Sequence, residues 1–160
     1  MIHEVSLKKA KPLLFSYYMS MPDKTELEKI ECEGFFVDLY LGELDKIVDM
    51  PADRAWKYEP YDIRLKLYSN EMTIEFKTKV KHPDNESLEV YKIFGKGPLI
   101  GDVGFIIYSY EEINTGSPNW KGVMVLRIPK RGMINGYWLT IGVNNDDKCP
   151  IGKISLKRKI

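Results

Sequence analysis

The sequence has few of the residues that most enzyme sites require. It contains 2 His and 2 Cys among 160 residues, and the cysteines, Cys32 and Cys149, are far apart in the chain. His3 is near the N-terminus, and His82 precedes a proline in a predicted turn. No Ser-His-Asp or Cys-His spacing stands out, and no group of residues supplies enough ligands for a metal ion. We therefore expect no enzymatic activity, no metal and no cofactor, and no disulfide framework.

Long apolar runs and a large net charge are also absent. No stretch reaches ~18 apolar residues, so the sequence predicts no transmembrane helix. The first 21 residues combine lysines with an apolar patch but lack a convincing signal-peptide cleavage site. A net charge of +1 provides no bulk attraction to DNA or RNA. These absences predict a soluble cytoplasmic protein that binds no nucleic-acid polymer, or a membrane-associated one if a transmembrane segment has been removed.

Charge is unevenly distributed along the chain. Residues 22–59 hold five basic and eleven acidic residues, a net charge of −6. Residues 121–160 hold nine basic and two acidic residues, a net charge of +7. Two interpretations remain open: the charges form complementary or simply solvated faces, or the basic end receives an anionic ligand.

Most of the chain alternates apolar and polar residues with the period of a half-buried β-strand. The pattern predicts one strand at 34–41 and a continuous meander to the C-terminus, with strands at about 62–68, 72–77, 88–94, 102–110, 121–128, 134–143 and 151–159. Closing such a meander removes exposed sheet edges. We therefore predict a mainly β protein, an eight-stranded antiparallel up-and-down, lipocalin-like barrel. A two-sheet sandwich remains the alternative.

The predicted domain organisation is simple. Residues 1–33 form an N-terminal leader, which includes a short helical region, and residues 34–160 form a single barrel domain. The best helix candidate after the leader is Asp45–Trp56, although Pro51 limits it. A helical insertion at about 45–57 is therefore expected between the first two strands.

The last strands indicate which side chains enter the barrel. Three of their inward faces begin with glycine, where a barrel bends or backbones approach closely; these faces are Gly122-Met124-Leu126-Ile128, Gly136-Trp138-Thr140 and Gly152-Ile154-Leu156-Arg158. Tyr108 and Tyr110 are in phase with them on the preceding strand. Turn positions put Tyr110 and Thr140 near one mouth and Arg158 near the other, roughly 13 Å away. An inward arginine needs an acceptor, either backbone carbonyls or an aromatic face, or the phosphate or carboxylate of a ligand.

The C-terminal third also resembles a known receptor barrel. Four short motifs carry the likeness, in order and spacing: Y-x-Y at 108–110, G-x-x-x-L-x-I at 122–128, G-x-[YW]-x-T at 136–140 and G-x-I-x-L-x-R at 152–158. They are similar to those of the cyclic-nucleotide receptor domain in the two-transmembrane, β-strand-rich effectors of bacterial anti-phage CBASS systems. The likeness covers about the last 55 residues well, and the middle strands by pattern only.

The resemblance implies a barrel that binds a cyclic dinucleotide made by a partner nucleotidyltransferase. Carried over to the matching positions, the ligand-binding residues are Tyr108, Tyr110, Trp138, Thr140 and Arg158. The family's transmembrane helices precede the barrel and are missing here, so we expect either a truncated effector or a free-standing barrel. A free-standing barrel would sequester the signal or report it to another chain. Self-association on ligand binding is left open.

Two other functions fit the same pattern. One is a lipocalin-like carrier of a different small ligand, and the other is a filled barrel that binds proteins and no ligand. A nucleotide pocket needs at least one cation that faces inward, whereas a carrier has an apolar lumen and a protein-binding barrel has no pocket. The inward phase of Arg158 favours the first of these three interpretations.

Overall fold

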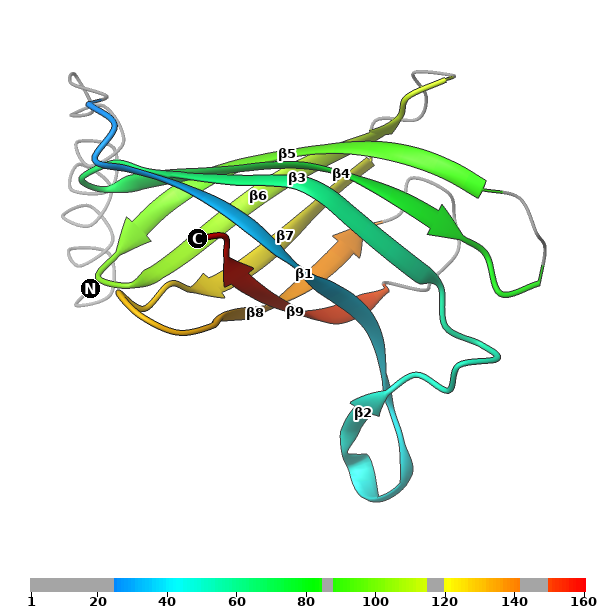
Figure 1. Cartoon of the computed structure of the whole chain (residues 1–160). Helices are drawn as coiled ribbons and strands as arrows, with labels where there is room; N and C mark the ends of the chain where they lie inside the picture. The colour runs from blue at the N-terminus through cyan, green and yellow to red at the C-terminus, as the bar shows by residue number, and fades with distance from the viewer. Residues whose placement is uncertain (1–24, 85–87, 115–119, 142–149) are drawn as a thin grey trace, which may run out of the picture.

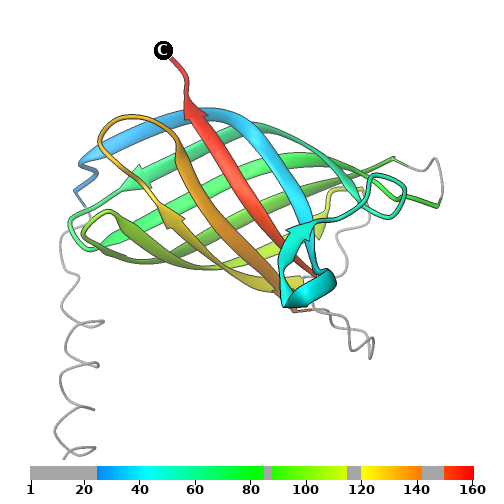
Figure 2. The same ribbon diagram turned by 90° about the horizontal axis from the view of Figure 1, so that it is seen from below.

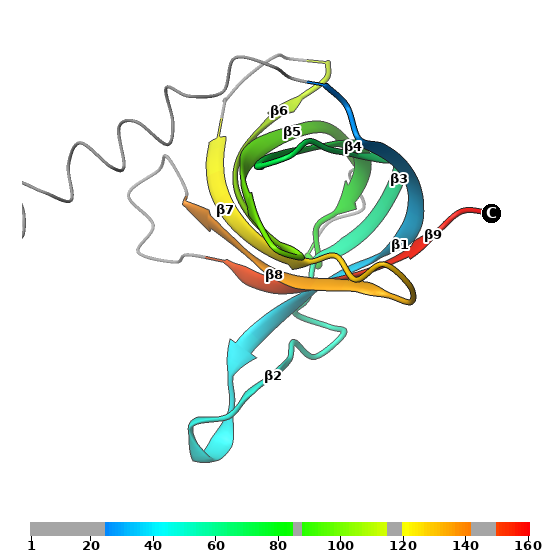
Figure 3. The same ribbon diagram turned by 90° about the vertical axis from the view of Figure 1, so that its left-hand side faces the viewer.

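The alternating pattern folds into a closed antiparallel barrel (Figure 1). The structure, a computed structural model, describes residues 25–84, 88–114, 120–141 and 150–160. Within them the strands are β1 (Glu28–Leu41), β2 (Ile47–Asp49), β3 (Lys57–Leu67), β4 (Glu71–Lys81), β5 (Leu88–Ile100), β6 (Val103–Glu112), β7 (Trp120–Arg127), β8 (Ile134–Ile141) and β9 (Ile151–Arg158). Strands β3 to β9 pair in sequence order, and β1 pairs with both β3 and β9. This double pairing closes the ring that Figure 3 shows end-on.

The predicted fold class is therefore confirmed as a mainly β, eight-stranded antiparallel barrel, with β2 as an additional strand outside the ring. The predicted N-terminal helical region lies in residues 1–24, outside the described part of the chain. Several predicted boundaries differ, since β1, β3, β4 and β5 are each longer than predicted. Strand β1 begins at Glu28 and not at 34. Its first residues were missed because outward Glu31 and Glu33, which alternate with inward Ile30 and Cys32, conceal the strand in a charged segment.

The helix predicted at 45–57 does not form. That segment holds the end of a short 3-10 turn at Glu43–Asp45, then β2, then turns up to Trp56. Strand β2 pairs with the end of β1, and the amide of Gly42 donates to the carbonyl of Lys46 at 2.8 Å. Pairing with β1 thus satisfies backbone groups that a helix would have satisfied internally. The resulting β1–β2 hairpin, residues 39–49, projects from the barrel (Figures 1 and 2).

A β-bulge in β3 changes which side chains face the lumen. The register with β4 shifts by one residue between Tyr61 and Arg64, and Asp62 has a φ of 54°. The extra residue reverses the alternation along the strand. As a result Tyr58, before the bulge, and Ile63 and Leu65, after it, all point inward.

The core fills one end of the barrel. Side chains there are at most 2% exposed and come from six of the eight barrel strands, β1, β3, β4, β7, β8 and β9, namely Cys32, Ile63, Leu65, Met72, Leu126, Ile134 and Leu156. We call this part of the lumen the filled end; it lies beside the β3–β4 and β7–β8 turns. The inward phases predicted for the last three strands are confirmed, since Met124, Leu126, Trp138, Ile154 and Leu156 are all buried. None of the described helices is long and apolar enough to cross a membrane.

Candidate functional site

The other end of the lumen contains a cavity of about 200 Å³. We call it the open end. Its lining is dominated by aromatic rings, and comprises Phe36, Trp56, Tyr58, Phe76, Tyr91, Tyr108, Tyr110 and Trp138, with Thr78, Val80, Ile93, Met124, Thr140 and Pro150 between them. The cavity is smaller than the ~300–1,000 Å³ of a site for a drug-sized molecule. It has room for one ring system.

Four of the five predicted ligand-binding residues meet in this cavity. Tyr108 and Tyr110 reach it from β6, and Trp138 and Thr140 reach it from β8. The Tyr108 hydroxyl lies 2.7 Å from Thr140 Oγ1 and 3.3 Å from the Leu139 carbonyl oxygen, to which it donates. The pairing of Tyr108 with Gly122 and of Gly122 with Thr140 places β7 between them. The sequence therefore located one wall of a real cavity.

Two glycines make room for the rings of that wall. A Cβ added to Gly122 would lie 2.3 Å from the Tyr108 hydroxyl oxygen, and one added to Gly152 would lie 2.2 Å from Cε2 of Trp138. Any larger residue would force the ring to move. The glycines predicted at the starts of these inward faces thus let two aromatic side chains lie flat against the barrel wall.

The opposite wall centres on a buried carboxylate. Asp38 is 6% exposed and accepts a hydrogen bond from the Tyr58 hydroxyl at 2.7 Å and from the Trp56 amide at 2.9 Å. Burial raises the pKa of Asp38, and the two hydrogen bonds oppose that rise. These bonds hold Tyr58 and the backbone of Trp56 at the mouth, where the Tyr58 ring meets Trp138 edge-on at 5.9 Å between centroids. Asp38 therefore positions the side of the cavity next to the β1–β2 hairpin.

The tyrosines of the cavity remain uncharged at neutral pH. Burial raises the pKa of Tyr108 to about 12, and it also raises the pKa of Tyr58, Tyr91 and Tyr110. The negative charge of Asp38 adds to the rise for Tyr58. Each hydroxyl keeps its proton, and those of Tyr58, Tyr91 and Tyr108 donate to Asp38, Glu89 and the Leu139 carbonyl. The cavity thus offers flat, uncharged rings.

The indole of Trp138 has a buried donor with no partner among the described residues. The residue is 8% exposed, and its Nε1 makes no hydrogen bond there. An unpaired buried N–H costs about 1–3 kcal/mol, which makes such a group an indicator of a function or of an unseen partner. A hydrogen-bond acceptor on a ligand, reached by a small rotation of the ring, would remove this cost.

The structure does not bring Arg158 to the cavity. Arg158 Nη2 donates to the Pro129 carbonyl at 2.9 Å, and Nη1 donates to that of Lys130 at 3.3 Å, so the side chain ties β9 to the β7–β8 turn. It pairs with Cys32, four residues before Phe36 on β1, which corresponds to roughly 13 Å along the strand. The predicted separation of Arg158 from the tyrosines is therefore found. Its acceptors are the backbone carbonyls that one of the sequence interpretations named.

The sequence analysis missed half of the cavity. Trp56 falls in the segment taken for a helical insertion, and Tyr58 lies between that segment and the strand predicted from about 62. The bulge at Asp62 also puts Tyr58 out of phase with Ile63. Tyr91 and Phe36 were counted as strand residues but not as lumen residues. The sequence did contain a signal for these lumen residues, because aromatic residues are frequent at the strand ends that lie on the same side of the meander.

No Lys or Arg is among the described residues that line the cavity, which are aromatic, aliphatic or hydroxyl-bearing. In the described ranges no group of three or more His, Cys, Asp or Glu is placed to hold a metal ion. A charged phosphate would therefore have to remain at the mouth.

No family model matches the chain, and neither a curated protein nor a solved structure does.

Proposed function

We propose that this barrel is a receptor for a small ligand that inserts one flat ring into the open end, and that the ring is a base of a cyclic dinucleotide. The observation that carries the proposal is the set of aromatic side chains converging on a cavity of one-ring size. Aromatic side chains stack on nucleobases with about 1–3 kcal/mol per base. The ligand class comes from the motif resemblance of the C-terminal strands.

In this proposal each predicted cavity residue has a task. Tyr108, Tyr110 and Trp138 supply stacking surfaces, and the unpaired Trp138 Nε1 donates to an acceptor on the base edge. Thr140 fixes the Tyr108 hydroxyl through their 2.7 Å contact. The rest of the ligand, with its phosphates, lies outside the cavity at the mouth. Arg158 supports the filled end and makes no ligand contact.

The wider role follows from the same resemblance. The signal would be made by a partner nucleotidyltransferase, as in the bacterial anti-phage CBASS systems. The chain would then act as the receptor part of an effector or as a free-standing barrel that sequesters the signal. The protein needs no catalytic residue, cofactor or metal for either role.

A second candidate is a carrier for an uncharged aromatic or apolar ligand. The specific observation in its favour is the absence of Lys and Arg from the described lining of the cavity. The sequence analysis set an inward cation as the mark of a nucleotide pocket, and the cavity has none. A carrier would bind the neutral ring and gain nothing from phosphates.

A thermal-shift panel separates the two candidates. The panel comprises cyclic dinucleotides and trinucleotides, the corresponding nucleosides, and indole as a neutral ring. A ligand at 100 times its dissociation constant adds about 2.7 kcal/mol of stability, which corresponds to a rise of about 5–10 °C in Tm for a domain of this size. We expect that rise for at least one cyclic dinucleotide, and a smaller one for its nucleoside.

Paired variants on β8 provide the control. Trp138→Ala should abolish the shift, whereas Tyr137→Ala, which removes a 64% exposed outward ring from the neighbouring position, should retain it. A shift with indole or a nucleoside that equals the shift with every cyclic dinucleotide would support the carrier. A panel without any shift would disprove both candidates.

A further inference from the structure

The carboxylate of Asp38 is buried beside the cavity without a counter-charge. It is 6% exposed, and the two groups that donate to it, the Tyr58 hydroxyl and the Trp56 amide, are both neutral. None of the ion pairs among the described residues includes Asp38. Buried carboxylates are ordinarily paired with a cation, because removing a charge from water is costly. The cavity therefore lies next to a negative charge that the described residues do not neutralise.

A second carboxylate acts on the cavity from β5. The Tyr91 hydroxyl donates to Glu89, and the Tyr91 ring lines the cavity and meets the Tyr110 ring at 5.6 Å between centroids. Tyr58 and Tyr91 are thus in the same situation, since each lines the cavity and donates to a carboxylate. A phenol that donates to an anion is polarised by it, and its ring becomes richer in electrons.

The protonation of these two tyrosines reflects the negative potential at this end of the barrel. Burial raises the pKa of both, and negative charge adds to the rise, from Asp38 for Tyr58 and from Glu89 and Glu112 for Tyr91. A potential that holds a proton on a tyrosine also attracts other cations. No Lys or Arg among the described lining residues offsets this potential.

The lining itself suits a cation without hydrogen-bond donors. Aromatic rings reach the cavity from β1, β3, β4, β5, β6 and β8, so a group at its centre meets rings on several sides. The negative face of an aromatic ring attracts cations, and cages of such rings recognise quaternary ammonium groups. The volume of about 200 Å³ limits the occupant to a head-group or a single ring.

We propose that the open end binds a small organic cation, a quaternary ammonium group or a single cationic ring, with Asp38 and Glu89 as its counter-charges. The cation lies against the aromatic rings, and Tyr58 and Tyr91 separate it from the two carboxylates. This assignment goes beyond the proposed function, because it gives the same cavity a second class of ligand. It does not depend on a cyclic dinucleotide, which would compete for the same space.

A pair of ligands that differ only in charge tests the proposal. The pair is choline and dimethylbutanol, the neutral analogue in which a tert-butyl group replaces the trimethylammonium group. Binding is followed by tryptophan fluorescence at constant ionic strength, since Trp56 and Trp138 line the cavity. We expect choline to bind at least about tenfold more tightly than the alcohol. Equal affinities, tighter binding of the alcohol, or no saturable binding of choline would overturn the proposal.

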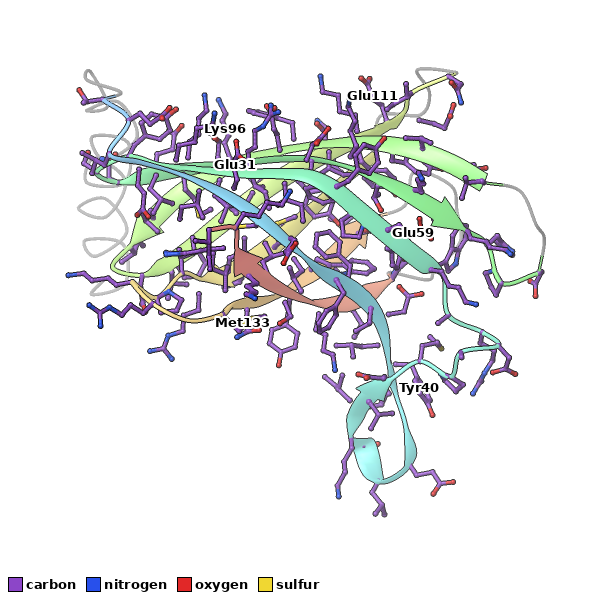
Figure 4. All side chains as sticks on the ribbon, viewed as in Figure 1. Glu31, Tyr40, Glu59, Lys96, Glu111 and Met133 are labelled. Atoms are coloured by element: carbon purple, nitrogen blue, oxygen red, sulfur yellow. The ribbon has the colours of Figure 1, made fainter. Side chains whose placement is uncertain are left out.

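Carboxylate variants test the source of the preference for choline. Asp38→Asn removes the charge and keeps the size of the side chain and one acceptor oxygen, so most of the preference should be lost. Glu59→Gln is the matched control, because it makes the same change in net charge at an exposed position of β3 (Figure 4) and should keep the preference. A folded Asp38→Asn protein that keeps the full preference would contradict the proposal. If thermal unfolding shows that this variant does not fold, Glu89→Gln decides in the same way.

Competition separates this proposal from the receptor proposal. Where both ligands bind, increasing choline should displace a cyclic dinucleotide. Choline binding without any dinucleotide binding would refute the receptor proposal alone. Dinucleotide binding without choline binding would refute the cation site alone.

Discussion

The two ends of the lumen are built from the same strands but differ in what fills them. At the filled end aliphatic side chains such as Leu65, Leu126 and Leu156 are completely buried. At the open end the inward positions of the same strands carry Tyr, Trp and Thr, which surround a cavity of about 200 Å³. Branched aliphatic side chains interdigitate at high density. Flat rings held against glycines do not fill the space in front of them.

In the proposed receptor, this difference separates stability from ligand binding along the barrel axis. Burial of the aliphatic side chains stabilises the closed ring. Among the described residues each end leaves one buried donor without a partner, Trp138 Nε1 at the open end and Arg158 Nε at the filled end, and the open end also buries the carboxylate of Asp38. Such costs are typical of functional sites, which the rest of the fold must support. Changes at the filled end should therefore alter stability, and changes at the open end should mainly alter ligand binding.

The largest effect should come from alkaline pH, because five buried or partly buried groups act in the same direction. Burial raises the pKa of Cys32, at the filled end, from 9.0 to about 11, and it raises the pKa of Tyr58, Tyr91, Tyr108 and Tyr110, at the open end, above the ordinary 10.0. The unfolded chain releases these protons first, so the stability is intact below about pH 9 and falls as the pH rises through the folded values. Urea unfolding at a series of pH values measures the fall.

Variants assign this fall to each end. Cys32→Ala should reduce the loss of stability that begins near pH 9, and Tyr108→Phe should reduce the loss of stability above pH 10. Tyrosinate absorbance should rise for these tyrosines only as the protein unfolds. A urea midpoint that stays constant up to about pH 11 would contradict this prediction. It would show that the pKa values of the five groups are not raised and that these groups titrate like ordinary surface groups.

A smaller effect is expected from a cavity made at the filled end. Leu156 is 0% exposed, and Leu156→Ala should cost about 2–5 kcal/mol in the free energy of unfolding. Urea unfolding measures it, with Leu88→Ala as the control, since Leu88 is 57% exposed on the barrel exterior and should change stability by less than ~0.5 kcal/mol. An equal loss of unfolding free energy in the two variants would contradict the claim that the side chains packed in the filled end stabilise the barrel.

The smallest effect on stability should come from blocking the open end. Gly152→Ala places a Cβ where Trp138 now lies, at 2.2 Å, and drives the indole toward the cavity. We expect a cost of about 1–3 kcal/mol, because the cavity gives the ring space to move. Ser155→Ala, at an outward position of the same strand, is the control. Ligand binding should be lost in the glycine variant and retained in the control. Unchanged binding would place the ligand elsewhere.

The sequence predicted the barrel and one wall of the cavity for a clear reason. From Val103 onward the strands alternate regularly, so the phase of Tyr108, Trp138 and Thr140 could be read without a structure. The other wall could not be read in this way. A single extra residue at Asp62 reverses the inward and outward alternation of β3. The hydrogen bond that the Trp56 amide donates to Asp38 joins two segments that are distant in the sequence.

The projecting hairpin escaped prediction for a related physical reason. Residues 45–56 contain helix-compatible residues, and local propensity favours a helix there. Pairing of β2 with the end of β1 overrides that preference, with Leu39 opposite Asp49 and Leu41 opposite Ile47. The destination of Arg158 was open for the opposite reason: its inward phase was readable, but its acceptors, the carbonyls of Pro129 and Lys130, belong to a turn.

Calorimetric titration of a cyclic dinucleotide into two variants tests the division of the lumen most directly. Tyr110→Ala removes a ring from the open end, and Arg158→Met removes the guanidinium from the filled end while retaining much of its apolar stem. We predict that Tyr110→Ala weakens binding at least tenfold, about 1.4 kcal/mol, and that Arg158→Met binds like the wild type. Normal binding by Tyr110→Ala together with a loss in Arg158→Met would place the ligand at the arginine and contradict the account.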